Sequence, residues 1–311
     1  MALSICEPIA TDPQGRELVE HGTALFPVAC YHDNISEIAV AWHWHDELEA
    51  LVVETGTARV AVNGTDCTVR QGEGMFINAG ALHGVWPAGE EVCRLRSVVF
   101  HPRLVGGGVD SMIWQKYLEP LLTDPCRPFV YFPGVSGWER DACSAIQEAW
   151  QACASEREGF EFAVRERLSR LIFLLSQHGP AAGKRPSEKA LRDGGRIKAM
   201  LQYIQAHYAE ELTLAKIAQS ANLSANECLR CFRSMIGSTP IQYVKQVRIQ
   251  KAAELLASTD RKISDIGGAC GFQEMSYFAK TFRALKGCTP GDFRKGGKVS
   301  AADCNQEAHP V

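Results

Sequence analysis

The chain has 311 residues, with 33 Lys+Arg against 36 Asp+Glu, a formal net charge of −3 and 46% hydrophobic residues. This length exceeds the usual single core, so two domains are expected. The composition is that of an ordinary globular protein, and no run approaches the ~18 apolar residues of a membrane span, so we expect no membrane partner.

The N-terminus lacks the basic stretch and apolar block of a secretory signal. Twelve scattered cysteines are too few for a disulfide scaffold, which indicates a reduced, cytoplasmic protein. The CxxC pair Cys228 and Cys231 falls on the apolar side of a predicted helix, so we interpret both as core residues.

Residues 22–101 predict a β domain, because short apolar runs alternate with turn signals such as the type I′ dipeptide Asn63-Gly64. Many short strands with regular turns are typical of a sandwich or small barrel. Residues 138–178 then take the helical period, with a polar turn at 154–159 between two apolar stripes. The Gly- and Pro-rich residues 179–195 predict a flexible linker.

Charge is unevenly distributed along the chain. Residues 196–298 carry 16 Lys+Arg against 8 Asp+Glu, a net +8, and the remainder carries −11. A polyanion partner is therefore expected for the basic segment.

The basic segment contains an internal repeat. Phe232-Arg233 recurs as Phe282-Arg283 and Thr239-Pro240 as Thr289-Pro290, fifty residues apart, whereas Ile217 matches Ile266 at an offset of 49. Each unit predicts helix, tight turn, helix. We expect Thr213 and Ser224 to cap the two helices of unit one. In unit two we expect Ser264 to cap the first helix, a turn at 270–272, and a second helix from about 274 to Gly287.

The second helix of each unit has one apolar and one outward side. Cys228, Cys231, Phe232 and Met235 share the apolar side in unit one, as do Phe278, Phe282 and Leu285 in unit two. The outward sets are Asn226, Leu229, Arg230 and Arg233, then Ser276, Ala279, Lys280 and Arg283 with Met275 beside them. Asn and Arg read adenine and guanine edges, and Lys holds phosphates. The repeat in a basic segment favours double-stranded DNA as partner over a merely solvated face.

The segment 196–295 resembles the AraC/XylS family of bacterial transcription regulators in IAQSANLS, LRCFRSMIGSTPIQYV, RIQKAAELL and GFQEMSYFAKTFRALKGCTPGDFR. The resemblance implies two helix-turn-helix units joined by a central helix at 241–257, inserted into successive major grooves. It assigns base reading to Asn226, Leu229, Arg230, Met275, Ser276, Ala279 and Lys280. Gly267-Gly268 departs from the family pattern and predicts a softer supporting helix.

His43, His45, Glu49, Gly56, Gly72, Gly80 and His83 resemble the two cupin motifs, with Asn78 in place of a proline. If one strand carries His43, His45 and Glu49, their even spacing places all three on one sheet face. Three imidazoles and a carboxylate suit a divalent metal, Zn, Fe, Mn or Ni. The alternatives are histidines that contact an organic effector, or buried structural ones. A small-molecule effector pocket would include Trp42, Trp44, His45, Phe76 and His83.

These observations predict an α+β protein. The expected parts are a cupin-like effector-sensing β-barrel (1–136), a helical dimerisation segment (137–178), the linker (179–195), a double helix-turn-helix domain (196–298) and a disordered tail (299–311). We expect an effector-responsive transcription regulator and take it to be an activator, although the residues do not separate activator from repressor. We expect a homodimer that contacts RNA polymerase and is not an enzyme. The alternative is a metal-dependent cupin enzyme fused to a DNA-binding domain.

Overall fold

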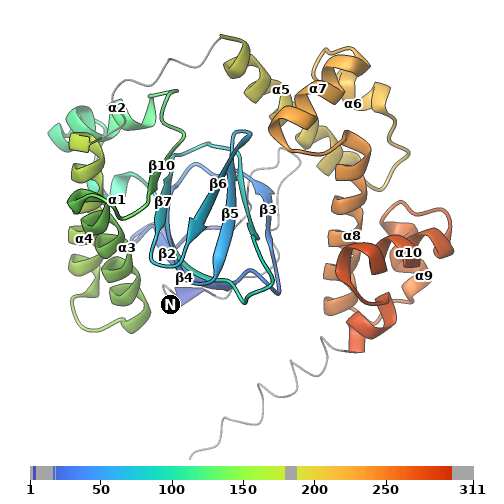
Figure 1. The fold of residues 1–311 in the computed structure, drawn as a ribbon, viewed down its shortest axis with the longest axis horizontal. Coiled ribbons are helices and arrows are strands. Elements are labelled where there is room, and N and C mark those ends of the chain that lie inside the picture. Colours follow the sequence, from blue (N-terminus) through green and yellow to red (C-terminus); the bar gives the residue numbers. More distant parts are fainter. Residues whose placement is uncertain (1–2, 5–16, 18, 179–187, 296–311) are drawn as a thin grey trace, which may run out of the picture. The chain divides into compact units, whose positions relative to one another are not determined.

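The structure is a computed structural model that describes residues 3–4, 17, 19–178 and 188–295 (Figure 1). It divides into two compact units, Met1–Gly195 and Arg196–Val311, at the point where the basic segment begins. The expected tail at 299–311 and residues 179–187 of the expected linker lie outside the described residues. Within the described ranges, no helix is long and apolar enough to cross a membrane.

The remainder of the expected linker is helical, and the prediction of a flexible linker is wrong there. Helix α5 spans Glu188–His207 and includes residues 188–195. Glu, Lys, Ala, Leu and Arg open this helix and are all strong helix formers. Gly194 and Gly195 cost about 1 kcal/mol each relative to Ala, which lowers the stability of a 20-residue helix without ending it.

Two sheets form the N-terminal unit and enclose a barrel-like core, as predicted (Figure 1). The four-stranded sheet has the order β3 (Val40–His43), β8 (His83–Pro87), β5 (Thr57–Val62) and β6 (Thr65–Arg70). The six-stranded sheet has the order β1 (Leu3–Ser4), β2 (Val28–Asn34), β9 (Arg94–Phe100), β4 (Leu48–Thr55), β7 (Gly74–Ile77) and β10 (Phe129–Phe132). Asn63 and Gly64 turn the β5–β6 hairpin with φ of 47° and 82°, the positive values that a type I′ turn requires.

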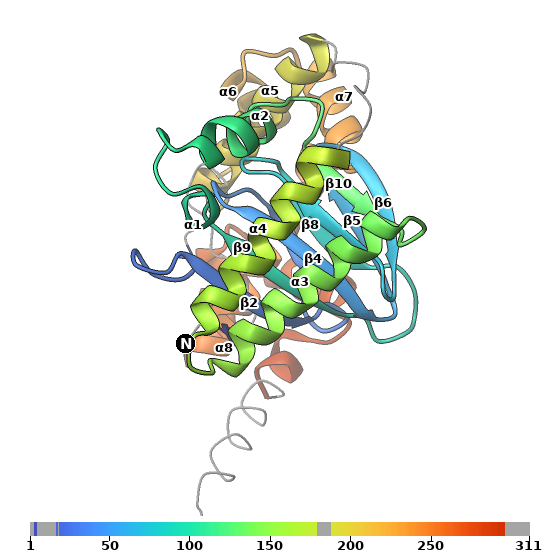
Figure 2. The ribbon, with the colours of Figure 1, turned by 90° about the vertical axis from the view of Figure 1, so that its left-hand side faces the viewer.

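Strand alternation gives the six-stranded sheet two apolar faces. Leu51, Met75 and Ile77 point into the barrel core, together with residues of the four-stranded sheet. The neighbouring Ala50 and Phe76 point the other way, toward helices α3 (Gly137–Ser155) and α4 (Phe160–His178). Figure 2 shows both helices lying over this sheet. Their bounds and the turn between them agree with the prediction, and their apolar stripes are core.

Several short elements between β9 and α3 have no counterpart in the sequence prediction. They are α1 (Arg103–Gly106), the π-helical turn η1 (Trp114–Leu118), α2 (Glu119–Leu122) and β10. Each is four or five residues long, which is too short for a periodic signal.

The C-terminal unit contains the two predicted helix-turn-helix units. Unit one is α6 (Leu214–Ser220) and α7 (Ala225–Met235), and unit two is α9 (Ile263–Ala269) and α10 (Met275–Lys286). The central helix α8 spans Pro240–Ser258. The free thiols Cys228 and Cys231 are buried, as expected for core residues.

The caps of unit one match the prediction, and one cap of unit two does not. Thr213 and Ser224 each accept a hydrogen bond from a backbone N–H of the first turn. Helix α9 instead begins after Lys262, so Ser264 lies within its first turn and hydrogen-bonds Asp265. Ser264 was a plausible cap because Ser favours that position, but the helix starts two residues earlier.

Candidate functional site

The predicted outward side of α7 is exposed. Asn226, Arg230 and Arg233 are exposed and Leu229 is half-buried, whereas Cys228, Cys231 and Phe232 are buried. The exposed side of α7 therefore presents one amide and two guanidinium groups, the chemistry that reads adenine and guanine in a major groove.

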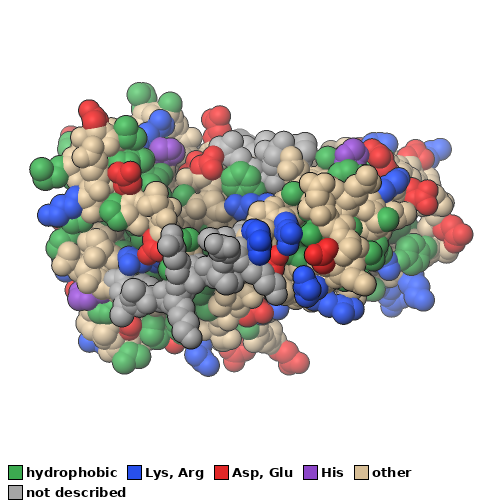
Figure 3. Space-filling model, turned by 90° about the horizontal axis from the view of Figure 1, so that it is seen from above, with side chains coloured by type: hydrophobic (Ala, Val, Ile, Leu, Met, Phe, Trp, Pro, Cys, Tyr) green, Lys and Arg blue, Asp and Glu red, His purple; other side chains and the backbone are tan. Residues whose placement is uncertain are grey.

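Helix α10 agrees with the predicted sides except at Met275 and Leu285. Ser276, Ala279, Lys280 and Arg283 are exposed. Met275 is half-buried against the core formed with Phe278 and Phe282, because the first turn of α10 packs on Gly267 of α9. Leu285, expected on the apolar side, is 46% exposed. Lys and Arg side chains are prominent on the C-terminal unit in Figure 3.

The second candidate site lies at one end of the barrel, where the chain crosses from one sheet to the other. His43 is the last residue of β3, Glu49 is the second residue of β4, and His45 lies in the connection between them. The expectation that one strand carries all three is therefore wrong. His83 opens β8 and pairs with His43 across the four-stranded sheet. The four side chains come together because the chain crosses between the sheets at this point, and not because alternate residues of one strand share a face.

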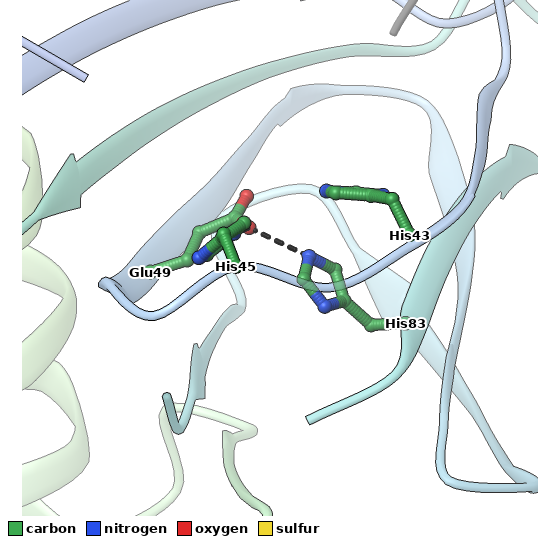
Figure 4. Close-up of side chains that lie close together, drawn as sticks. All are labelled: His43, His45, Glu49 and His83. Carbon is green, nitrogen blue, oxygen red and sulfur yellow. Dashed lines mark hydrogen bonds and ion pairs between the residues drawn. The ribbon is translucent and has the colours of Figure 1, made fainter. Parts of the chain in front are cut away.

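All four side chains are buried and point toward one another (Figure 4). The Nδ1 atoms of His43, His83 and His45 lie 2.9, 2.8 and 3.2 Å from the carbonyl oxygens of Ala41, Ala81 and Glu47. Because a carbonyl only accepts, each Nδ1 carries its hydrogen and donates it. This fixes the ring orientation and leaves each Nε2 as the atom available inside the cluster.

Glu49 binds two of these imidazoles. Its Oε2 lies 3.0 Å from Nε2 of His83 and 3.4 Å from Nε2 of His45. Burial favours the neutral carboxyl, but these hydrogen bonds and the charge of the imidazoles outweigh it and hold the pKa of Glu49 well below its usual range. The contact with Glu49 likewise outweighs burial at His83 and raises the pKa of that imidazole.

Burial, reinforced by the charge of His83, lowers the pKa of His43 to about 3. His43 is therefore neutral near pH 7, whereas the Glu49 carboxylate favours the protonated form of His83. The four ligand atoms lie within 4.8 Å of one another. Zn, Fe, Mn and Ni in proteins are commonly bound by imidazole nitrogens and carboxylates. The second nitrogen of each ligand imidazole usually donates to a group such as a backbone carbonyl, as it does here.

The structure places the side chains of two residues of the predicted effector pocket, Phe76 and Trp42, outside the barrel core. Phe76 points away from the barrel core and packs between the six-stranded sheet and the helices. Trp42 has the opposite orientation to His43 in β3 and packs on Trp86, which also stacks under Arg59 on the outer face of β5. Proximity in sequence was a poor guide here, because alternate residues of a strand face opposite sides. Trp44 is half-buried beside His45.

Two side chains near this site, Glu17 and His21, carried no recognised signal in the sequence, and a third, Asn78, was noted only as a departure from the motif. Glu17 and His21 precede the barrel and contact each other at 3.2 Å. Their spacing of four is a weak signal that belongs to neither cupin motif. Asn78, which departs from the motif, donates through Nδ2 to the carbonyls of Leu121 (2.7 Å) and Arg127 (3.1 Å). Proline lacks such a donor, so the substitution adds a connection.

Comparison with known proteins identifies both parts of the chain. Residues 25–172 match the family described as AraC-like ligand binding domain, and residues 217–296 match that described as helix-turn-helix domain. An uncharacterized HTH-type transcriptional regulator of Bacillus subtilis, YdeC, is 29% identical over 91% of this chain and 97% of its own length. The HTH-type transcriptional activator RhaS of Klebsiella pneumoniae is 26% identical over 82% of this chain and 87% of its own.

Among solved structures, an AraC-type DNA-binding domain protein from Chromobacterium violaceum is 28% identical. That match covers 33% of this chain and 92% of the other, with a TM-score of 0.32. The two family matches and the full-length relatives lead to one conclusion. The chain belongs to the AraC family of transcription regulators and combines an AraC-like ligand-binding domain with a helix-turn-helix DNA-binding domain.

Proposed function

We propose that this regulator binds a specific DNA site by inserting α7 and α10 into successive major grooves. The observation that carries the proposal is the exposed polar side of each helix, repeated fifty residues apart in a segment of net charge +8. Footprinting on its own promoter region over a salt series tests it, because neutralised phosphates set the salt dependence and base contacts set the specificity.

Arg230→Ala is the sharpest single substitution for this proposal. Loss of a bidentate base contact is expected to cost about 1–3 kcal/mol in specific binding and to relax the preference at one base pair. Lys262→Ala, which removes an equal charge at the start of α9, is the control and should weaken all sequences alike. Equal weakening of every sequence by Arg230→Ala would contradict base reading by Arg230.

We propose that the barrel binds a small-molecule effector and that this ligand shifts the DNA-binding equilibrium by differential affinity. The relatives are named as regulators, which supports ligand binding rather than catalysis. RhaS is named an activator, so we propose activation through contact with RNA polymerase in the cytoplasm. A thermal-shift screen of the full chain tests ligand binding, because a bound ligand raises the unfolding temperature by mass action.

We propose that α4 pairs two copies of the chain. Phe162 is 82% exposed, and Phe173, three helical turns later on the same side, is 42% exposed. Exposed aromatic residues on one helix face are typical of a protein interface. Light scattering of Phe162→Glu should give a monomer where the wild type gives a dimer, and a dimer of unchanged stability would exclude this face.

We propose finally that His43, His45, Glu49 and His83 bind a divalent transition metal. The three histidines each donate a hydrogen bond from Nδ1 to a backbone carbonyl, so that each Nε2 faces the inside of the cluster. This arrangement is typical of metal-binding histidines and supports the proposal. When bound, such an ion would hold both sheets together and offer an open coordination position to a ligand. Elemental analysis of wild type and His83→Ala tests it, and equal metal content in both would exclude the site.

A further inference from the structure

The Glu17–His21 pair lies against the histidine cluster from outside the cupin motifs. Oε2 of Glu17 lies 3.2 Å from Nε2 of His21 and 3.6 Å from Nε2 of His43. Glu17, His21 and His45 form a second group of donor atoms within 4.8 Å of one another, and His45 belongs to both groups. The segment before the barrel therefore reaches the same cluster that β3, β4 and β8 build.

The contact between Glu17 and His43 has the spacing of two donors that share one cation. Nδ1 of His43 donates to Ala41, so its Nε2 is the atom that faces Oε2 of Glu17, 3.6 Å away. Neighbouring donors of one five-coordinate ion with bonds of ~2.1 Å stand about 3.0–3.6 Å apart, which includes the separation found here. A shared divalent ion accounts for this geometry.

One divalent cation would neutralise both carboxylates of the cluster, Glu17 and Glu49. His21 and Tyr31 hold Glu17 in place. Because a carboxylate only accepts, Nε2 of His21 donates to Glu17, which leaves Nδ1 of His21 to accept from the hydroxyl of Tyr31 at 2.8 Å.

We propose that Glu17 is a further ligand of the metal at the His43–His45–Glu49–His83 site and that His21 is its positioning residue. A divalent transition metal then fastens the segment that precedes the barrel onto the barrel end. This inference rests on the metal site proposed above and adds a ligand that the cupin motifs do not contain.

The test is a titration of metal-free full-length protein with Co²⁺, followed by absorbance and by calorimetry. Glu17→Gln keeps the size of the side chain and removes its charge, so its affinity for Co²⁺ is expected to fall about 10–100-fold, with a changed d–d spectrum. Glu20→Gln is the matched control, because Glu20 is an exposed residue of the same segment. It should bind Co²⁺ like the wild type.

His21→Gln retains an N–H donor and His21→Ala does not, so a positioning role predicts a larger loss of affinity in His21→Ala. Metal-free unfolding temperatures of all variants show whether each one folds. Wild-type affinity and spectrum in a folded Glu17→Gln, with binding lost in His83→Ala, would refute the Glu17 ligand and leave the barrel site intact. Wild-type protein that binds no Co²⁺ would refute both.

Discussion

The two helix-turn-helix units make the same turn with different residues. In unit one Asn222 has a φ of 53°, and N–H of Leu223 donates to Ala218. In unit two Gly271 has a φ of 83°, and N–H of Phe272 donates to Gly267. These positions correspond at an offset of 49, whereas the helix caps Ser224 and Glu274 correspond at 50. The residue gained in unit two is therefore in the turn, between Phe272 and Glu274.

The units differ in where their stability comes from. In unit one, Ser224 and Glu227 form a reciprocal capping box at the start of α7. In unit two, Glu274 makes no side-chain capping bond with any residue that the structure describes. Unit two instead packs four phenylalanine rings in one core, Phe272, Phe278, Phe282 and Phe293. Phe282 meets both Phe278 and Phe293 edge to face, and Phe272 is tilted against Phe278. Local capping stabilises one recognition helix, and long-range aromatic packing stabilises the other.

The largest loss of stability is expected from a substitution in the aromatic core of unit two. Phe282→Ala should lower the free energy of unfolding of the C-terminal unit by about 3–5 kcal/mol, because it leaves a cavity among buried rings. Circular dichroism in urea measures it. All six tryptophans lie between residues 42 and 150, so tryptophan fluorescence follows the N-terminal unit and should not change. A loss below about 1 kcal/mol would contradict the assigned source of stability.

The turns provide the second comparison. A Cβ at Gly271 would lie 2.8 Å from the carbonyl oxygen of Ala209 and would require a left-handed backbone. We expect Gly271→Ala to destabilise unit two by about 2 kcal/mol or more. Asn222→Ala, the matched change in unit one, should cost about 1 kcal/mol. Equal losses in the two unfolding curves would show that the contact with Ala209 is unimportant.

Substitutions at the two helix caps are expected to change stability by smaller amounts and in opposite directions. Ser224→Ala removes the capping hydrogen bonds of α7 and should cost about 1 kcal/mol. Glu274→Ser supplies a cap to α10 and should gain a similar amount, since Ser is strongly preferred at this position. If both substitutions are neutral in urea unfolding, then helix capping does not distinguish the units.

The smallest effect concerns the two glycines of α9. A Cβ at Gly268 meets no described atom within 4 Å, so Gly268→Ala should stabilise unit two by about 0.5–1 kcal/mol. A Cβ at Gly267 would lie 2.9 Å from the end of Met275 and 3.0 Å from Phe278. Gly267→Ala should therefore gain less or be unfavourable. If Gly267→Ala stabilised unit two more than Gly268→Ala, the first turn of α10 would have to shift away from α9 at little cost.

The sequence predicts the helical parts well because repeat and period are local properties. The bounds of α3, α4 and α7 follow from apolar spacing and caps, and those of α8 follow from the resemblance to the AraC/XylS family. The barrel end is different, since His43, His45 and Glu49 were expected to converge for a reason that the structure contradicts. Whether a residue such as Phe76 faces the barrel core depends on sheet register. The contacts of Glu17 depend on a segment outside every recognised motif. Neither the direction of Phe76 nor the contacts of Glu17 could therefore be predicted from residue spacing.

Asn78 links the barrel end to the helical layer. Its side chain bonds the carbonyl of Arg127, and the guanidinium of Arg127 donates to the carbonyl of Leu175 in α4 at 3.1 Å. Asn78 also lies two residues before Gly80, whose N–H donates to His45. Movement of the barrel end must therefore either break these hydrogen bonds or displace the 121–127 segment against α4. This gives the domain a short mechanical path from the histidines to its outer helix.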